Sequence, residues 1–201
     1  MTRVYLIRHG ESTWNAERRW QGAMDPPLSA NGRAQADRLA AAFQAIPLHV
    51  VYCSPLQRAK DTATAIAAAQ ALSVEPIFDL REIAFGEWES LGDDEVQQRY
   101  GSLRQQWFRR PDQTQIPGAE SLAQGRERAM EAMRGIVSRH PDGQVAVVAH
   151  GGMNKLILLT LLDAPLSSFW RLAQSNACIN IVEFGSARGH VLAVNDTTHL
   201  K

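Results

Sequence analysis

Two of the six histidines in this sequence each stand at the predicted carboxyl end of a strand and are each followed by glycine. His9 follows the apolar run at 4–7, and His150 follows the longer apolar run at 144–149. In open α/β sheets, ligands bind at this edge of the sheet, and glycine there lets the backbone approach a bound group closely. Neutral imidazole is a competent nucleophile near pH 7, because its unperturbed pKa is about 6.5. The two histidines therefore predict a site for nucleophilic chemistry.

Two arginines accompany these histidines. Arg8 directly precedes His9, and Arg58 follows the predicted strand at 49–53, in the first turn of a helix that we expect Ser54 to cap. Helix N-termini favour anions, and the planar guanidinium of arginine can hold two phosphate oxygens at once. Nearby arginines also disfavour the charged form of the His9 imidazole. Two guanidiniums and two imidazoles from three strand ends predict a site for a phosphoryl group.

A leaving oxygen needs a proton, and a phosphorylated histidine must later be attacked by an activated water. One carboxyl group can do both jobs in sequence. The best candidate is Glu82, which follows the third predicted strand at 74–78. Glu11 is the rival, but its place beside His9 favours an orienting or structural role.

Strand and helix patterns alternate along the chain, which is typical of an α/β fold with a largely parallel sheet. Two further strands are predicted at 177–184 and 190–194, and helices are predicted after Ser29, from Ser121 and at 153–162. We expect a single domain over residues 1–201.

Between residues 81 and 118 the regular pattern breaks down. We expect short helices and loops there, forming a cap-like insertion at about 81–120 over the site. Trp88 and Trp107 are expected to pack this cap. Four arginines of the cap are expected on a solvated face, with contact to an anionic substrate tail as the alternative. They are Arg99, Arg104, Arg109 and Arg110.

The composition excludes several other classes of protein. The 201 residues are 45% hydrophobic, and 21 basic residues balance 21 acidic ones, which argues against a sequence-independent nucleic-acid binder. No apolar run approaches the length of a membrane span, and we expect neither a membrane partner nor a secretory signal. Cys53 and Cys178 are too few for a disulfide framework or a metal site, so we expect buried reduced thiols and a cytoplasmic location. We expect no metal and no cofactor, and a homodimer stays open.

Three blocks of the sequence resemble the histidine phosphatase superfamily, whose fold is that of phosphoglycerate mutase. The matching blocks are RHGES at 8–12, SPLQRA at 54–59 and VAHGG at 148–152. This resemblance covers nearly the whole chain. It implies a three-layer α/β/α sandwich with a mostly parallel central sheet.

The resemblance also implies roles for individual residues. His9 would be the phosphorylated nucleophile and Glu82 the proton donor. The phosphoryl oxygens would be held by Arg8, Arg58 and His150. The pocket would be completed by Asn15, Gln21, Gly22 and Gly151.

Within the superfamily, the stretches at 80–89 and 117–121 are similar to α-ribazole phosphatases and broad-specificity phosphatases. Ser90 stands where those phosphatases often have glycine, which calls the local turn into question. The expected function is that of a metal-independent phosphomonoesterase acting through a phosphohistidine on His9. Its expected partner is a small-molecule phosphate ester, with α-ribazole phosphate among the candidates. The alternatives are a cofactor-dependent phosphoglycerate mutase and a non-catalytic phospho-ligand binder.

Overall fold

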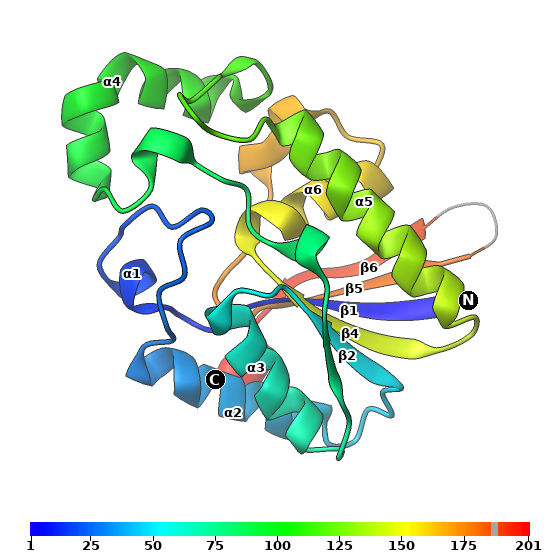
Figure 1. The fold of residues 1–201 in the computed structure, drawn as a ribbon. Coiled ribbons are helices and arrows are strands. Elements are labelled where there is room, and N and C mark those ends of the chain that lie inside the picture. Colours follow the sequence, from blue (N-terminus) through cyan, green and yellow to red (C-terminus); the bar gives the residue numbers. More distant parts are fainter. Residues whose placement is uncertain (186–188) are drawn as a thin grey trace.

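A six-stranded sheet forms the centre of the protein in a computed structural model that describes residues 1–185 and 189–201 (Figure 1). The sheet order is β3-β2-β4-β1-β5-β6. Strands β1 to β4 run parallel, whereas β5 is antiparallel to both β1 and β6. The strands are β1 Thr2–Arg8, β2 Val50–Cys53, β3 Val74–Pro76, β4 Gln144–Ala149, β5 Ile179–Phe184 and β6 Gly189–Asp196.

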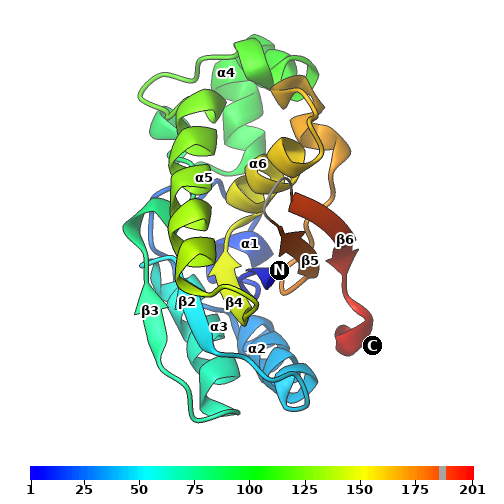
Figure 2. The ribbon, with the colours of Figure 1, turned by 90° about the vertical axis from the view of Figure 1, so that its right-hand side faces the viewer.

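Helices cover both faces of the sheet, as Figure 2 shows. Side chains alternate along β1, so that Val4 and Leu6 enter one core while Tyr5 and Ile7 enter the other. The first core includes residues of α5 and α6, and the second includes residues of α2 and α3. The predicted α/β/α sandwich is therefore confirmed. These helices are α2 Ala30–Phe43, α3 Gln57–Ala68, α5 Leu122–Arg139 and α6 Gly151–Leu161.

The start of α3 differs from the prediction. Leu56, not Ser54, is its N-cap residue, and the helix begins at Gln57. The Ser54 hydroxyl instead accepts a hydrogen bond from the Leu56 amide (3.2 Å) and lies 2.7 Å from Nε2 of His150. This serine therefore joins two strand ends, and Arg58 still falls in the first turn of the helix.

Residues 81–120, where the sequence predicts a cap of short helices and loops, contain a longer helix than expected. Helix α4, Asp93–Arg109, spans 17 residues and is interrupted at Tyr100, whose backbone is not helical. Val96 and Trp107 are its buried side chains, so its apolar periodicity is too weak to read from sequence. Trp88 and Trp107 are buried, as expected. The short elements are α1 Thr13–Ala16, η1 Phe78–Leu80, η2 Gly86–Trp88, η3 Pro111–Gln113, η4 Leu166–Arg171 and η5 Thr198–Leu200.

The turn at Ser90 is kept although glycine is absent. Ser90 has a φ of +70°, in the left-handed region that glycine adopts most easily. Its amide donates to the Trp20 carbonyl at 2.8 Å, and its own carbonyl accepts from Arg19 at 3.2 Å. The turn is therefore held by its neighbours against the steric preference of serine.

Cys53 and Cys178 are buried free thiols, as expected. Within the described residues, no helix is both long enough and apolar enough to cross a bilayer.

Candidate active site

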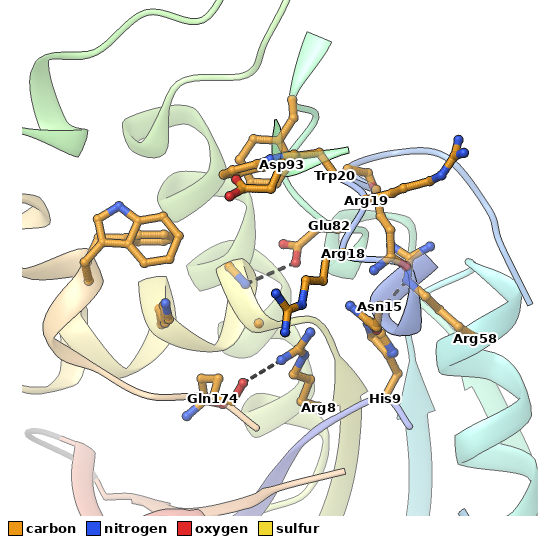
Figure 3. A pocket seen from close by; sticks show the side chains of 18 residues that line it. Arg8, His9, Asn15, Arg18, Arg19, Trp20, Arg58, Glu82, Asp93 and Gln174 are labelled. Carbon is orange, nitrogen blue, oxygen red and sulfur yellow. Dashed lines mark hydrogen bonds between the residues drawn. The ribbon is translucent and has the colours of Figure 1, made fainter. Parts of the chain in front are cut away.

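A pocket of about 360 Å³ opens at the carboxyl edge of the sheet, between the strand ends and the cap (Figure 3). Eight of the nine predicted site residues line it, while His150 is fully buried beside His9 and is not a lining residue. The eight are Arg8, His9, Asn15, Gln21, Gly22, Arg58, Glu82 and Gly151.

The His9 ring is held with one nitrogen free for chemistry. Nδ1 lies 2.6 Å from the Gly10 carbonyl oxygen, which only accepts, so Nδ1 carries the proton. Nε2 then keeps its lone pair and accepts a hydrogen bond from Nε of Arg58 at 3.3 Å. Burial, followed by the charges of Arg58 and Arg8, holds the pKa of His9 well below its usual 6.5. His9 is therefore a neutral imidazole in which Nε2 is the nitrogen that carries a lone pair.

Backbone carbonyls fix the two arginines beside His9. Arg58 donates to the Met24 carbonyl at 2.7 Å and to the Gly22 carbonyl at 3.0 Å, and Arg8 donates to the Gln174 carbonyl at 2.6 Å. Burial lowers the pKa of Arg58 to about 10, which leaves it charged at neutral pH. Nε of Arg8 is buried and has no hydrogen-bond partner among the residues that the structure describes. An unsatisfied buried donor in a cationic pocket indicates a place for an anion.

His150 packs behind His9, with ring centroids 5.1 Å apart, and is fully buried. Its Nε2 is bonded to Ser54 Oγ, whereas its Nδ1 has no partner in the described part of the chain. Burial, and then the charge of Arg58, holds its pKa well below 6.5. The ring is thus neutral and fixed, with one nitrogen left to bind a ligand.

The Glu82 carboxylate rests on the N-terminus of α6. It accepts from the amides of Gly152 at 3.1 Å and Met153 at 3.2 Å, and its carboxyl group faces the pocket in Figure 3. Glu11, the rival candidate, accepts a hydrogen bond from Ser29 Oγ at 2.6 Å near the start of α2 and is not a lining residue. The geometry therefore favours Glu82 as the carboxyl group of the site.

Arg128 on α5 anchors the loop that carries Glu82. It donates to the carbonyls of Asp79 and Arg81, both at 2.7 Å, and to that of Glu82 at 3.2 Å. It also forms a bidentate pair with Glu120, with both bonds at 2.6 Å. Nothing in the sequence near Arg128 indicates that it meets a loop 46 residues away, so this contact could not be predicted.

The wall beside His9 is built by two polar side chains and one glycine. Asn15 Oδ1 accepts from the Ser12 amide at 3.1 Å and from Asn176 at 3.0 Å, so its NH₂ group is left for a ligand. Gln21 Oε1 accepts from the Ser12 hydroxyl at 2.7 Å. Gly22 has a φ of +55°, and a Cβ there would meet a Glu89 carboxylate oxygen at 2.1 Å. Glycine is thus required at this position.

The outer half of the pocket was not predicted. It is lined by Arg18, Trp20, Phe85, Lys155, Phe169 and Trp170, among others. The four cap arginines are not lining residues; Arg104, for example, pairs with Asp93 at 2.6 Å.

The described residues contain no group of three or more His, Cys, Asp or Glu side chains placed to hold a metal ion.

The fold and the pocket define a class of α/β protein with an arginine-rich pocket at the carboxyl edge of its sheet. The model of the histidine phosphatase superfamily (branch 1) matches residues 4–197, and the chain belongs to this family. The chain is an enzyme of the phosphatase class, as are relatives in the same family that are named phosphatases.

Several curated relatives cover the full chain. Phosphoserine phosphatase 1 of Hydrogenobacter thermophilus is 34% identical over 200 residues, which is 100% of this chain and 95% of that protein. The probable phosphoglycerate mutase GpmB of Salmonella typhi is 31% identical over 205 residues, with the same two coverages.

Solved structures agree with the fold. YhfR of Bacillus stearothermophilus has a TM-score of 0.96 and 32% identity, with 100% of both chains covered. The α-ribazole phosphatase of Shigella flexneri has a TM-score of 0.86 and 24% identity, with 96% of both chains covered. The chain thus shares its fold with an α-ribazole phosphatase, as the sequence predicts.

Proposed function

We propose that this enzyme is a metal-independent phosphomonoesterase that hydrolyses small phosphate esters through a phosphohistidine on His9. The observation that carries the proposal is the lone pair on His9 Nε2, which faces a pocket flanked by the buried Arg58 and the partly buried Arg8. A neutral nucleophile surrounded by fixed cations suits attack on a phosphoryl group, because the cations stabilise the negative charge on the transferring oxygens.

In the first step, His9 Nε2 attacks phosphorus and the bond from phosphorus to the ester oxygen breaks. Arg8, Arg58, Asn15 and His150 Nδ1 hold the phosphoryl oxygens through their free donors. The leaving oxygen takes a proton from the Glu82 carboxyl group. The products of this step are an alcohol and phosphorylated His9.

In the second step, the Glu82 carboxylate takes a proton from water as the water oxygen attacks phosphorus. The bond between phosphorus and Nε2 breaks, which releases inorganic phosphate and restores neutral His9. One carboxyl group thus serves as acid and then as base. The hydrogen bonds from the α6 amides keep it in place for both steps.

Rapid-quench labelling with a ³²P-labelled phosphomonoester tests this mechanism. We expect an acid-labile, base-stable phosphoenzyme in the wild-type protein and none in His9→Ala. Full hydrolysis by His9→Ala would falsify the mechanism.

A phosphoglycerate mutase is the second candidate, because the GpmB relative carries that name at 31% identity. Incubation with 3-phosphoglycerate and a trace of bisphosphoglycerate separates the two activities. Release of phosphate faster than formation of the isomer supports the phosphatase, and the reverse supports the mutase.

A phospho-ligand binder without turnover is the third candidate. Assays with a panel of phosphate esters decide it, because a binder would show affinity for an ester and no release of phosphate. Phosphoserine and α-ribazole phosphate belong in this panel, since relatives or structural neighbours bear the corresponding names.

A cytoplasmic location accompanies the proposal, supported by two buried thiols that remain unpaired. A homodimer is tested by light scattering of the purified protein.

A further inference from the structure

Lys155 lies in the pocket wall and has no part in the chemistry proposed above. It belongs to α6 and is only 8% exposed, yet it is one of the lining residues. Its ammonium nitrogen lies 4.2 Å from the ring centre of Trp170 and 4.8 Å from that of Phe169. Within the described residues, no carboxylate or other acceptor forms an ion pair or hydrogen bond with it.

A buried ammonium group without an acceptor is unfavourable, because contact with aromatic rings replaces only part of its hydration. Burial and the charge of Arg8 lower the pKa of Lys155 to about 8, so the group is still mostly protonated at neutral pH. The protein thus maintains a desolvated positive charge that faces an open pocket. Such a group is explained by an anion that arrives with the ligand.

The position of Lys155 fits the length of a small substrate. Gly151 adjoins the phosphoryl site, since a Cβ on it would lie 3.4 Å from the unpaired Nε of Arg8. Lys155 follows four residues later on the same face of α6, about 6 Å along the helix axis. A carboxylate separated from the ester oxygen by two or three carbons can span that separation.

Arg18 supplies a second unpaired cation at the mouth of the pocket. Its backbone has a φ of +55° and is fixed by a bond from the Asp93 amide to its carbonyl at 3.2 Å. Figure 3 shows its side chain directed into the pocket. Among the described residues, its guanidinium has no hydrogen bond or ion pair, whereas that of neighbouring Arg19 pairs with Glu17 at 2.9 Å.

We infer that Lys155, with Arg18 at the mouth, forms a carboxylate subsite, so that the substrate class is small phosphomonoesters bearing a carboxylate near the ester. This inference rests on the proposed phosphatase function and deepens it. The four cations then divide between two anions, with Arg8 and Arg58 on the phosphoryl group and Lys155 and Arg18 on the carboxylate. Trp20, Phe85, Phe169 and Trp170 form the apolar wall between and around them.

The test compares two esters that differ in one group: 3-phosphoglycerate, which has a carboxylate, and glycerol 3-phosphate, which has a hydroxymethyl group there. Binding is measured by calorimetry on His9→Ala, so that no turnover interferes. We expect 3-phosphoglycerate to bind about tenfold to hundredfold tighter, the strength of one charge-assisted hydrogen bond. In His9→Ala/Lys155→Met this ratio should fall close to one, and Arg18→Met should reduce it by a smaller factor.

Two controls separate charge from packing. Lys60→Met removes an exposed lysine on α3 and should leave the ratio as it is. Lys155→Arg keeps a positive charge and should retain part of the preference, which a purely structural lysine would not produce. Circular dichroism checks that each variant folds.

Each proposal can fail alone. Equal binding of the two esters by His9→Ala, no binding of 3-phosphoglycerate, or a ratio that Lys155→Met leaves unchanged overturns the carboxylate subsite. The phosphatase function is tested separately, by hydrolysis of p-nitrophenyl phosphate with the wild-type protein.

Discussion

At the scale of single residues, the chemistry depends on which atoms are already satisfied. The Gly10 carbonyl accepts the hydrogen bond from Nδ1 of His9, and the Ser54 hydroxyl is hydrogen-bonded to Nε2 of His150. His150 Nδ1 and Arg8 Nε stay without a partner among the described residues, and His9 Nε2, the proposed nucleophile, accepts only the 3.3 Å bond from Arg58. These contacts fix both rings in the folded protein, in the orientation that phosphoryl transfer needs.

Removing the acid at Glu82 should affect esters according to their leaving groups. Glu82→Gln should lower kcat/KM for glycerol 3-phosphate by roughly 10² to 10⁴-fold, because an alkoxide needs a proton. The loss should be much smaller for p-nitrophenyl phosphate, whose phenolate leaves as a stable anion. Steady-state kinetics on both esters measures this difference, and Glu11→Gln, at the rival carboxyl group, is the control that should show no such difference between the two esters. Equal losses on the two esters would contradict the acid role.

At the scale of elements, Arg128 makes helix α5 a support for the Glu82 loop. Lysine in its place keeps the charge but loses the bidentate bond to Glu120 and part of the set of bonds to the loop carbonyls. Arg128→Lys should therefore lower kcat about tenfold with a smaller change in KM, since small displacements of a catalytic group are costly. Kinetics on one ester tests this, and Arg134→Lys on the exposed face of α5 is the matched control. A rise in KM with an unchanged kcat would show that Arg128 acts on substrate binding instead.

The turn at Ser90 offers a test of backbone strain. A left-handed conformation costs a non-glycine residue roughly 1–2 kcal/mol, and glycine at position 90 would remove this strain. Glycine also raises the entropy of the unfolded chain, which offsets up to about 1 kcal/mol of the stability gained. Ser90→Gly should therefore raise the free energy of unfolding by about 0.5–1 kcal/mol, measured by urea denaturation. Ser90→Ala keeps the Cβ and should give no such gain; stabilisation by alanine would refute the strain argument.

The sequence was sufficient for features that depend on local pattern. Strand ends followed by His-Gly, and the helix starts at Ser29 and Ser121, were predicted because parallel strands bring their carboxyl ends together and helix-start signals are local. Arg128, Lys155 and the pairing of Ser54 with His150 were missed. Each depends on which distant segment packs against it, and no periodicity or short motif encodes that.

At the scale of the whole molecule, two histidines are buried in neutral form. The pKa values of His9 and His150 are held well below 6.5 in the folded protein, whereas both titrate near 6.5 when unfolded. As the pH falls below about 6.5 the unfolded state therefore binds more protons, and stability is lost.

We expect the free energy of unfolding to decrease between pH 7 and pH 5.5, approaching about 1.4 kcal/mol per pH unit for each histidine at the acidic end. Urea denaturation across this range measures the slope, and it avoids the region below pH 5 where carboxylates dominate. His9→Asn/His150→Asn should flatten the slope. A wild-type protein of constant stability over this interval would show that the two rings are not buried neutral in the way described.

The strand order has a consequence for how the protein is made. β1 and β2 are not neighbours in the sheet, because β4 lies between them and pairs with both. His9 and Arg58 therefore leave the ribosome well before the strand that sets the spacing between them, which lies about 85 residues after Arg58. Chains emerge N-terminus first, and contacts between distant segments form late in folding. If His9 acts as proposed, a nascent chain thus carries its nucleophile in an inert form until β4 is inserted, and catalytic competence arrives together with completion of the fold.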